Sequence, residues 1–368
     1  MKKIIRSFVY LVLICQVVFI SKSFALTEIK PTDDGFLYTG RVGFNQQKQA
    51  IVSWPGTSIK ANITGDQLIV VMDDDNGKNF FNVIINGEDN YPAVLSLKKG
   101  THEYDLSYLL FNRNNKANQI EIFKRTEGHE GASRFLGFKL ADGAKLLAAP
   151  KPLKRKIAYF GDSITSGMGN EGADNGKDDL ESEKNHYLSY AAITARNLNA
   201  EFHTTSLSGI GFMVSWFDFI MPQYYDQLSA AGNNDTLWDF KQWQPDLVVV
   251  NLGQNDSWLI DNEKRLQPEP SEREIINAYK GFINQLKAVY PDARFICALG
   301  SMDATKAERK HWVNYIKTGV DELNQADPKH KIEFITFDFN GYYAHPRVAQ
   351  HVDNANKLTA KIKQVMGW

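Results

Sequence analysis

The sequence predicts two domains, an all-β jelly-roll sandwich followed by an α/β domain with a parallel sheet. In the first part of the chain, short β-prone runs alternate with turn dipeptides such as Asn86-Gly87 and Lys99-Gly100, and no long amphipathic helical pattern interrupts them. After residue 153, apolar strands alternate with helical patterns, which indicates βαβ units. A length of 368 residues suits two domains of about 100–200 residues each.

Many short strands at regular spacing fill the first domain, which we place at residues 26–150. They favour an antiparallel sandwich of the jelly-roll type, because the intervening glycines and asparagines supply the positive φ angles that tight turns require. Such a sandwich either binds glycans or serves as a structural partner of the next domain, and both roles stay open. The expected strands are residues 36–42, 50–54, 58–64, 67–72, 80–85, 102–106, 118–123 and 134–140.

The second domain is expected at residues 151–368, after an extended connector marked by Pro150 and Pro152. One of its strands contains Val248-Val249-Val250, an apolar run typical of a strand buried on both faces. A doubly covered parallel sheet of this kind binds ligands beyond the carboxyl ends of its strands. We expect helices at residues 187–198, 276–289 and 346–362, and strands at residues 157–160, 201–206, 247–252, 294–299 and 332–337.

The composition is that of an ordinary globular protein, with 43% hydrophobic and 23% charged residues. A formal net charge of −1 gives no electrostatic reason to expect a nucleic acid or an anionic membrane as partner. Of the two cysteines, Cys15 lies in the N-terminal apolar run and Cys297 lies in a strand pattern. Removal of the N-terminal run would leave one cysteine, so we expect no intramolecular disulfide.

The first 25 residues have the pattern of an export signal. Basic residues precede an apolar run over residues 8–20, and Ser23-Phe24-Ala25 places small residues around a cleavage position. A spanning helix is less favoured, because the run is short for the bilayer and contains Gln16. A lipoprotein anchor at Cys15 is disfavoured by the bulky Ile14 before it. We therefore expect a bacterial periplasmic or secreted protein that has no contact with the membrane after cleavage.

Polar residues follow several of the expected strands of the second domain. Gly161-Asp162-Ser163 ends the first strand, Gly209 lies in the turn after the second, Asn255 follows the third, and His345 comes after the fifth. Because the carboxyl ends of parallel strands meet at one edge, these residues are expected to converge. A hydroxyl, an imidazole, an amide and a glycine turn are the components of acyl transfer: nucleophile, base and oxyanion donors.

Each of these residues also has a purely structural interpretation. Ser163 or Asp162 can cap a helix, Gly209 can serve only as a turn residue, and Asn255 can cap its loop or the next helix. His345 can cap the last helix or bind a buried carbonyl. The convergence of all of them at one edge favours catalysis over these separate explanations.

Together these residues resemble the four sequence blocks of the SGNH hydrolases, and longer stretches resemble carbohydrate esterase family 2. The matching stretches are residues 53–58, 124–127, 160–167 and 243–246, together with His345-Pro346 and His351. The resemblance implies a jelly roll joined to a flavodoxin-like SGNH domain that removes acetyl groups from polysaccharides such as xylan or glucomannan, or from their oligosaccharides. It implies that Ser163 is the nucleophile and His345 the general base. The oxyanion donors would be the backbone N–H groups of Ser163 and Gly209 and the amide of Asn255, with no metal or cofactor.

The chain departs from the SGNH pattern near the histidine. An aspartate commonly stands three residues before it, whereas this chain has Tyr342 there, and the nearest acid in the segment is Asp338. We therefore interpret the site as a Ser–His dyad in which a backbone carbonyl orients the imidazole, as the resemblance allows for some members. The polar residues 174–185 are interpreted as a solvated loop near the site.

Two tryptophans stand next to residues of the expected site. Trp216 and Trp258 follow the glycine turn and Asn255, where they either stack on sugar rings or belong to the core.

One alternative function is an esterase acting on O-acetyl groups of the bacterial envelope or capsule, and another is a non-catalytic glycan-binding protein. A metal-dependent phosphoesterase is disfavoured, because no Asp-x-His or Asn-His pair stands beside the Gly161-Asp162 element.

Overall fold

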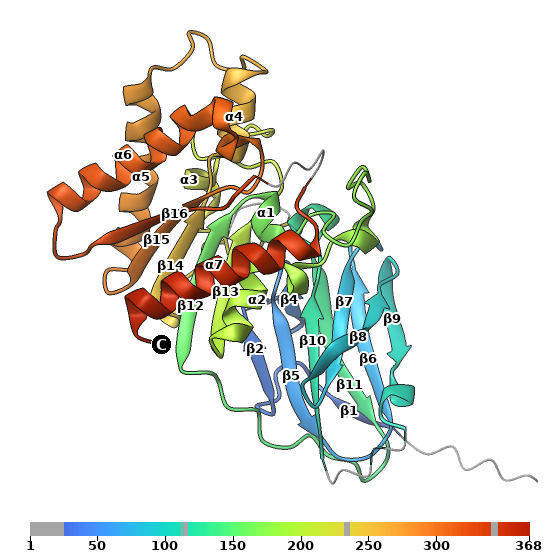
Figure 1. Cartoon of the computed structure of the whole chain (residues 1–368). Coiled ribbons are helices and arrows are strands. Elements are labelled where there is room, and N and C mark those ends of the chain that lie inside the picture. Colours follow the sequence, from blue (N-terminus) through green and yellow to red (C-terminus); the bar gives the residue numbers. More distant parts are fainter. Residues whose placement is uncertain (1–25, 112, 114–116, 232–235, 340–344) are drawn as a thin grey trace, which may run out of the picture.

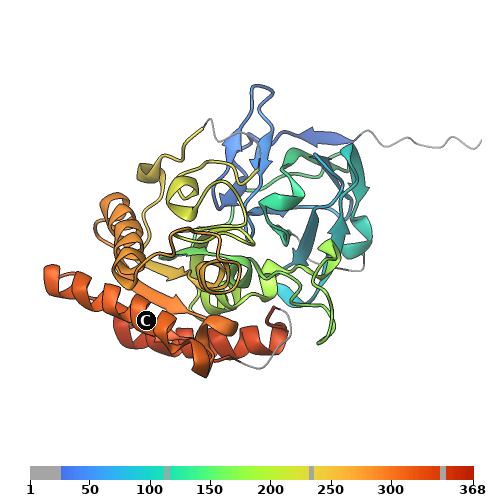
Figure 2. The same cartoon turned by 90° about the horizontal axis from the view of Figure 1, so that it is seen from above.

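Two antiparallel sheets and one parallel sheet make up the structure, a computed structural model that describes residues 26–368 except 112, 114–116, 232–235 and 340–344. The expected export signal, residues 1–25 with Cys15, lies outside the described residues. Figures 1 and 2 both show the antiparallel sheets, coloured blue to teal, beside the α/β domain rather than in line with it. The prediction of a sandwich followed by a parallel-sheet domain is confirmed.

The sandwich consists of two sheets of short strands. One has the order β3-β4-β11-β6-β9 with β1 paired to β11, and the other has the order β2-β5-β10-β7-β8. The strands are β1 (Thr27–Ile29), β2 (Phe36–Thr39), β3 (Gly43–Phe44), β4 (Ala50–Val52), β5 (Ser58–Ile63), β6 (Leu68–Asp74), β7 (Phe80–Ile85), β8 (Glu88–Ser96), β9 (Gly100–Asp105), β10 (Asn118–Lys124) and β11 (Ser133–Leu140). In β6 the side chains of Leu68, Val70 and Met72 are buried and alternate with more exposed ones, the pattern of a strand with one face on a core.

The parallel sheet has the strand order β13-β12-β14-β15-β16. In chain order this is 2-1-3-4-5, the order of flavodoxin-like folds, in which strands are added first on one side and then on the other side of the first strand. Its strands are β12 (Arg155–Gly161), β13 (Ala200–Ser206), β14 (Leu247–Asn251), β15 (Arg294–Leu299) and β16 (Ile332–Thr336). Every residue of β14 is buried, as its valine run predicted.

Helices cover both faces of this sheet. The apolar sides of α5 and α6 pack on one face through residues such as Tyr279 and Trp312, and α2 and α7 pack on the other through Tyr190 and Leu358. Figure 1 shows α7 running across the front of the sheet. The helices are α1 (Ser163–Ser166), α2 (Tyr190–Asn197), α3 (Met221–Tyr224), α4 (Gln254–Asp261), α5 (Glu272–Val289), α6 (Lys310–Ala326) and α7 (Val348–Met366). Among the described residues, no helix has both the length and the apolar character needed to cross a bilayer.

The two domains share buried contacts. Trp54 of the sandwich is 1% exposed, belongs to the core beneath α5 and donates its indole N–H to the carbonyl of Leu228 at 2.9 Å. Arg41 reaches across the boundary and donates to the carbonyls of Tyr225 and Gln227 at 2.7 and 2.8 Å. Burial of this extent indicates that the domains form a continuous interface rather than two bodies on a flexible linker.

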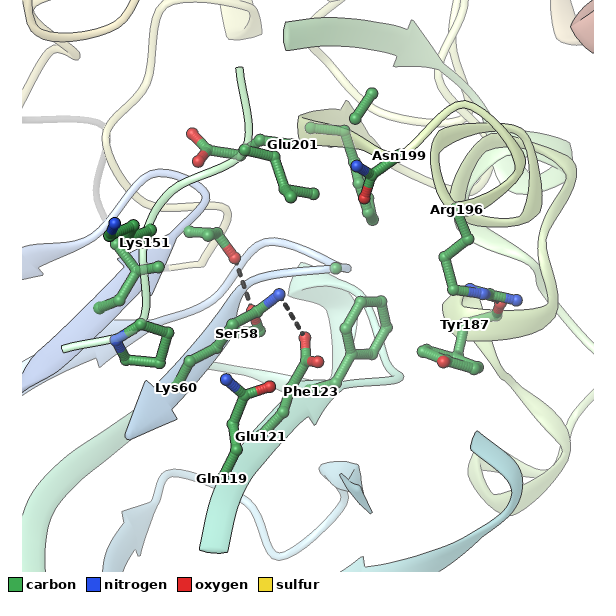
Figure 3. Close-up of a pocket in the computed structure, with 17 residues that line it drawn as sticks. Ser58, Lys60, Gln119, Glu121, Phe123, Lys151, Tyr187, Arg196, Asn199 and Glu201 are labelled. Atoms are coloured by element: carbon green, nitrogen blue, oxygen red, sulfur yellow. Dashed lines mark hydrogen bonds and ion pairs between the residues drawn. The ribbon is translucent and has the colours of Figure 1, made fainter. Parts of the chain in front are cut away.

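A cavity of about 330 Å³ also lies at this boundary (Figure 3). Polar side chains on its sandwich side are already paired: Lys60 with Glu121 at 3.2 Å, and the hydroxyls of Thr39 and Ser58 at 2.5 Å. The described residues lining it include no histidine beside a serine, and its α/β lining includes the start of β13 and the end of α2. It therefore lies at the amino ends of the strands, on the opposite side from the edge where parallel sheets bind ligands.

Candidate active site

Ser163 is placed by a tight turn between β12 and α1. Asp162 adopts an extended conformation as the N-cap, and its Oδ1 accepts the backbone N–H of Ile164 at 3.0 Å. The turn requires Gly161, because a Cβ there would come within 2.0 Å of the Thr165 hydroxyl. Ser163 is consequently the first residue of α1, at the carboxyl end of the central strand, and is 4% exposed.

His345 comes from the C-terminal part of the α/β domain and contacts Ser163. It follows β16 and precedes α7, and its Nε2 lies 2.8 Å from the Ser163 Oγ. The two residues stand 182 positions apart in the chain. The structure thus brings together the serine and the histidine that the sequence marked at the ends of separate strands.

A carboxylate completes this chain of hydrogen bonds. Oδ2 of Asp178 lies 2.9 Å from Nδ1 of His345 and also accepts the backbone N–H of His345 at 2.9 Å. The interpretation of a dyad oriented by a backbone carbonyl is therefore wrong. So is the interpretation of residues 174–185 as solvated throughout, because Asp178 is only 3% exposed. No local spacing could identify it: it stands among the polar residues after Ser163, far from His345 in sequence.

Arg347 holds Asp178 in place. Its guanidinium pairs with Oδ1 of Asp178 and donates to the carbonyl oxygens of Gly169 and Ala173 in the same loop. Asp178 has φ +63°, and a Cβ on Gly169 would come within 2.5 Å of its Oδ1, so the loop closes tightly around the carboxylate. Burial by itself would raise the pKa of Asp178, but hydrogen bonds from the side chain and backbone of His345 and from Arg347 hold it below the ordinary value. The acid is thus kept ionised.

The turn after β13 and the start of α4 are tied together beside the serine. Gly209 has φ +90°, and the Asn255 amide donates to the carbonyl of Ile210 at 2.9 Å. Behind them, Asp256 is buried and accepts the backbone N–H groups of three consecutive residues: Phe212, Met213 and Val214. These bonds favour its charged form, yet burial dominates and raises the pKa of Asp256 to about 6. The glycine turn and Asn255 therefore form one rigid unit.

A cavity of about 320 Å³ opens over these groups, and both tryptophans line it together with Ser163, Asn255 and His345. Trp216 is 46% exposed and Trp258 is 42% exposed, so neither is a core residue. The remaining lining comes from Gln254, Met302, Asp303, Lys306 and Phe339, which the sequence analysis did not single out. Gly209 does not line the cavity, but it packs against Trp216, since a Cβ there would lie 3.2 Å from the indole.

Among the described residues, no group of three or more His, Cys, Asp or Glu side chains is arranged to hold a metal ion. The expectation of an esterase without metal or cofactor stays a prediction.

Two family models match the chain, one in each part. Residues 38–150 match the model described as carbohydrate esterase 2 N-terminal. Residues 159–364 match the GDSL-like lipase/acylhydrolase family.

Individual relatives agree with these matches. The chain is 34% identical to the cellulase/esterase CelE of Acetivibrio thermocellus over 92% of its own length, and it spans only 40% of that larger protein. It is 29% identical to an acetylxylan esterase / glucomannan deacetylase of Cellvibrio japonicus, covering 88% of each chain. The structure of a family two carbohydrate esterase from Clostridium thermocellum, in complex with cellohexaose, superposes with a TM-score of 0.79 at 32% identity, covering 91% of this chain and all of the other. The chain therefore belongs to carbohydrate esterase family 2, a family of carboxylic ester hydrolases with a GDSL-like catalytic domain.

Proposed function

We propose that this protein is an exported serine esterase that removes O-acetyl groups from polysaccharides such as xylan or glucomannan. The observation that carries the proposal is the chain of hydrogen bonds from Ser163 through His345 to Asp178, at the mouth of an open cavity. The names of the Cellvibrio relatives, acetylxylan esterase / glucomannan deacetylase, support this substrate class. The cellohexaose in the Clostridium structure supports a site that accepts β-linked glycan chains.

In the first step, Ser163 attacks the carbonyl carbon of the acetyl ester while Nε2 of His345 takes its proton. The backbone N–H groups of Ser163 and Gly209 and the amide of Asn255 would stabilise the resulting oxyanion. Donors of this kind contribute about 2.7–4 kcal/mol each in enzymes where they have been removed. Asp178 accepts the Nδ1–H of His345, which fixes the tautomer and stabilises the imidazolium as it forms.

The imidazolium then returns the proton to the departing sugar oxygen, and an acetyl-serine remains. In the second step His345 takes a proton from water and the hydroxide oxygen attacks the acetyl carbon. Ser163 is expelled and recovers this proton from His345, and the acetic acid that leaves ionises in solution. The protons and the leaving groups balance within these two steps, and the transfers between Ser163 and His345 use atoms that lie 2.8 Å apart.

Trp216 and Trp258 would recognise the sugar rather than the acetyl group. Each exposes more than two fifths of its surface at the rim of the cavity, and indole faces stack well on the apolar face of a pyranose ring. Arg265 lies over the Trp216 ring at 4.5 Å, which holds the indole in one orientation. The acetyl ester would then be presented to Ser163 while its ring rests against these side chains.

The decisive experiment assays acetate release by residues 26–368 from acetylated xylan, acetylated glucomannan and an O-acetylated envelope glycan. We expect turnover of a plant polysaccharide by the wild type, and none by Ser163→Ala at unchanged thermal stability. Turnover of the envelope glycan alone would favour the alternative esterase. Binding of glycans without acetate release by the wild type would identify a non-catalytic binding protein. Substantial turnover by Ser163→Ala would refute the mechanism.

Export is a separate part of the proposal. It rests on the basic and apolar pattern of residues 1–25. Expression of the full chain in a bacterial host, followed by mass measurement of the periplasmic fraction, is expected to give a product that begins at Leu26. An uncleaved product retained in the membrane would overturn this part alone.

A further inference from the structure

A buried charged segment of the sandwich lies against the catalytic loops. It begins at the last residue of β10 and consists of Lys124, Arg125, Thr126 and Glu127, each no more than 3% exposed. Charged side chains are seldom buried this completely unless they are paired. Their partners therefore indicate what the segment does, and two of these side chains have partners in the α/β domain.

Arg125 binds both ends of the loop that contains Asp178. Its guanidinium pairs with Glu171 at the start of the loop and donates to the carbonyls of Ser182 and Lys184 at the end, at 3.0 and 3.3 Å. The backbone carbonyl of Arg125 also accepts the N–H of His186 at 2.9 Å. A planar guanidinium with several fixed donors can close a loop in this way, whereas an ammonium cannot match the same geometry.

A second buried pair strengthens the same contact. Glu130, in the short 3-10 helix Gly128–Glu130 of the sandwich, pairs with Lys184, and their side chains are 3% and 11% exposed. Within the loop, Asn170 and Asn185 close the base by two hydrogen bonds of 2.8 and 3.0 Å. The loop is thus attached to the sandwich near its base, while Arg347 holds Asp178 near its tip.

Glu127 makes the matching contact to the other catalytic element. Its Oε2 accepts the backbone N–H of Ser208 at 2.7 Å, directly before Gly209. The described residues that line the catalytic cavity include neither Arg125 nor Glu127. Both therefore act on the chemistry only through the backbone that they hold.

We propose that the sandwich is part of the catalytic apparatus, with Arg125 as a positioning residue for the Asp178 loop and Glu127 as one for the Gly209 turn. The proposal rests on the esterase function above. A strained, ionised Asp178 must stay within hydrogen-bond reach of His345, and a shift of about 1 Å in such a group is enough to cost roughly a hundredfold in rate. The sandwich supplies the rigid support that prevents the shift.

The test compares Arg125→Lys with Arg41→Lys. Both replace a buried sandwich arginine that donates to carbonyls across the domain boundary, but Arg41 contacts the segment at residues 225–227 rather than a catalytic loop. We expect both variants to lose thermal stability. Only Arg125→Lys is expected to lower kcat, by about tenfold or more, with KM for a small acetyl ester nearly unchanged.

A double-mutant cycle with Asp178→Asn identifies the route of the effect. If Arg125 acts through Asp178, Arg125→Lys adds little further loss of kcat in the Asp178→Asn background. Losses that multiply, or equal losses in Arg41→Lys, would overturn the proposal. Should Arg125→Lys fail to fold, Glu171→Gln removes the partner of Arg125 on the more exposed side and takes its place in the cycle.

Glu127 is tested by a pair of substitutions. Glu127→Gln keeps an oxygen that can accept the Ser208 N–H, and we expect it to retain most of the wild-type kcat. Glu127→Leu removes the acceptor and is expected to lower kcat; equal kcat in both variants would exclude the positioning role. Ser163→Ala serves as the reference throughout: if it stays active the esterase function fails, and if it is inactive while the cycle is additive only the positioning role fails.

Discussion

Asp178 and His345 stand 167 residues apart, yet one oxygen of the aspartate accepts both the side-chain Nδ1–H and the backbone N–H of the histidine, each at 2.9 Å. The carboxylate therefore fixes the position of the histidine as well as its tautomer. A backbone carbonyl could orient the ring, but it would offer less stabilisation to the imidazolium.

Asp178→Asn is the first prediction. The amide can donate to Nδ1 and favour the wrong tautomer, so we expect kcat to fall roughly 10²–10⁴-fold in an acetate-release assay. Asp179→Asn is the matched control, because Asp179 is exposed next to it in the chain. Comparable losses in both variants would mean that the effect is one of net charge in the loop rather than of contact with His345.

Asn255→Ala tests the oxyanion site. Loss of one donor is expected to lower kcat about 10²–10³-fold with little change in KM, because the donor acts on charge that develops only in the transition state. The variant also loses the bond to the Ile210 carbonyl, so its thermal stability must be measured in parallel. A change confined to KM would contradict the assigned role.

Trp216→Ala and Trp258→Ala test recognition of the sugar. Because each indole is more than two fifths exposed, we expect the thermal stability to change little. The KM for an acetylated oligosaccharide is expected to rise roughly three- to tenfold, as the loss of about 0.5–1.5 kcal/mol of stacking implies. The KM for a small ester such as 4-nitrophenyl acetate is expected to stay unchanged, and an equal rise for both substrates would argue against stacking.

Asp162 predicts a pH dependence of stability. Burial raises the pKa of this N-cap carboxyl from 3.8 to about 7, although the hydrogen bond from Ile164 opposes the shift. A raised pKa means that the folded chain binds the proton more tightly than the unfolded chain. The stabilisation is therefore complete below about pH 4 and is lost as the pH rises to about 7.

Asp162→Asn retains a capping oxygen but cannot ionise. The Tm of the variant minus that of the wild type is expected to increase between pH 4 and 7 and then level off. Asp256, whose pKa is raised to about 6 by burial, titrates in the same sense but is present in both proteins. A difference in Tm that stays constant over this range would show that Asp162 does not bind a proton more tightly in the folded chain.

Elements whose structure is decided by local sequence pattern could be predicted best. The valine run correctly predicted a buried strand at β14, and the turn glycines correctly predicted the short antiparallel strands of the sandwich. β8 was not predicted, because Pro92 weakens the strand signal; this proline is tolerated since β8 is an edge strand. α6 was not predicted either, although Trp312, Ile316 and Val320 repeat there at helical spacing.

The residues of the candidate site also fall into those that the sequence could predict and one that it could not. Ser163, Asn255 and His345 each follow a strand, so sheet topology brings them to one edge and the residues themselves mark the chemistry. Asp178 follows no strand, and its place depends on Arg347 and on a loop closed by contacts with another domain. Such contacts are tertiary and have no spacing that a single sequence can reveal.

The position of Asp178, in the segment after Ser163, has a consequence for genome surveys. A search that judges catalytic competence by the position three before the histidine would read a tyrosine there and class this gene product as acid-deficient. A search that also looks for an aspartate downstream of the serine and an arginine two positions after the histidine would find Asp178 and Arg347 in this chain.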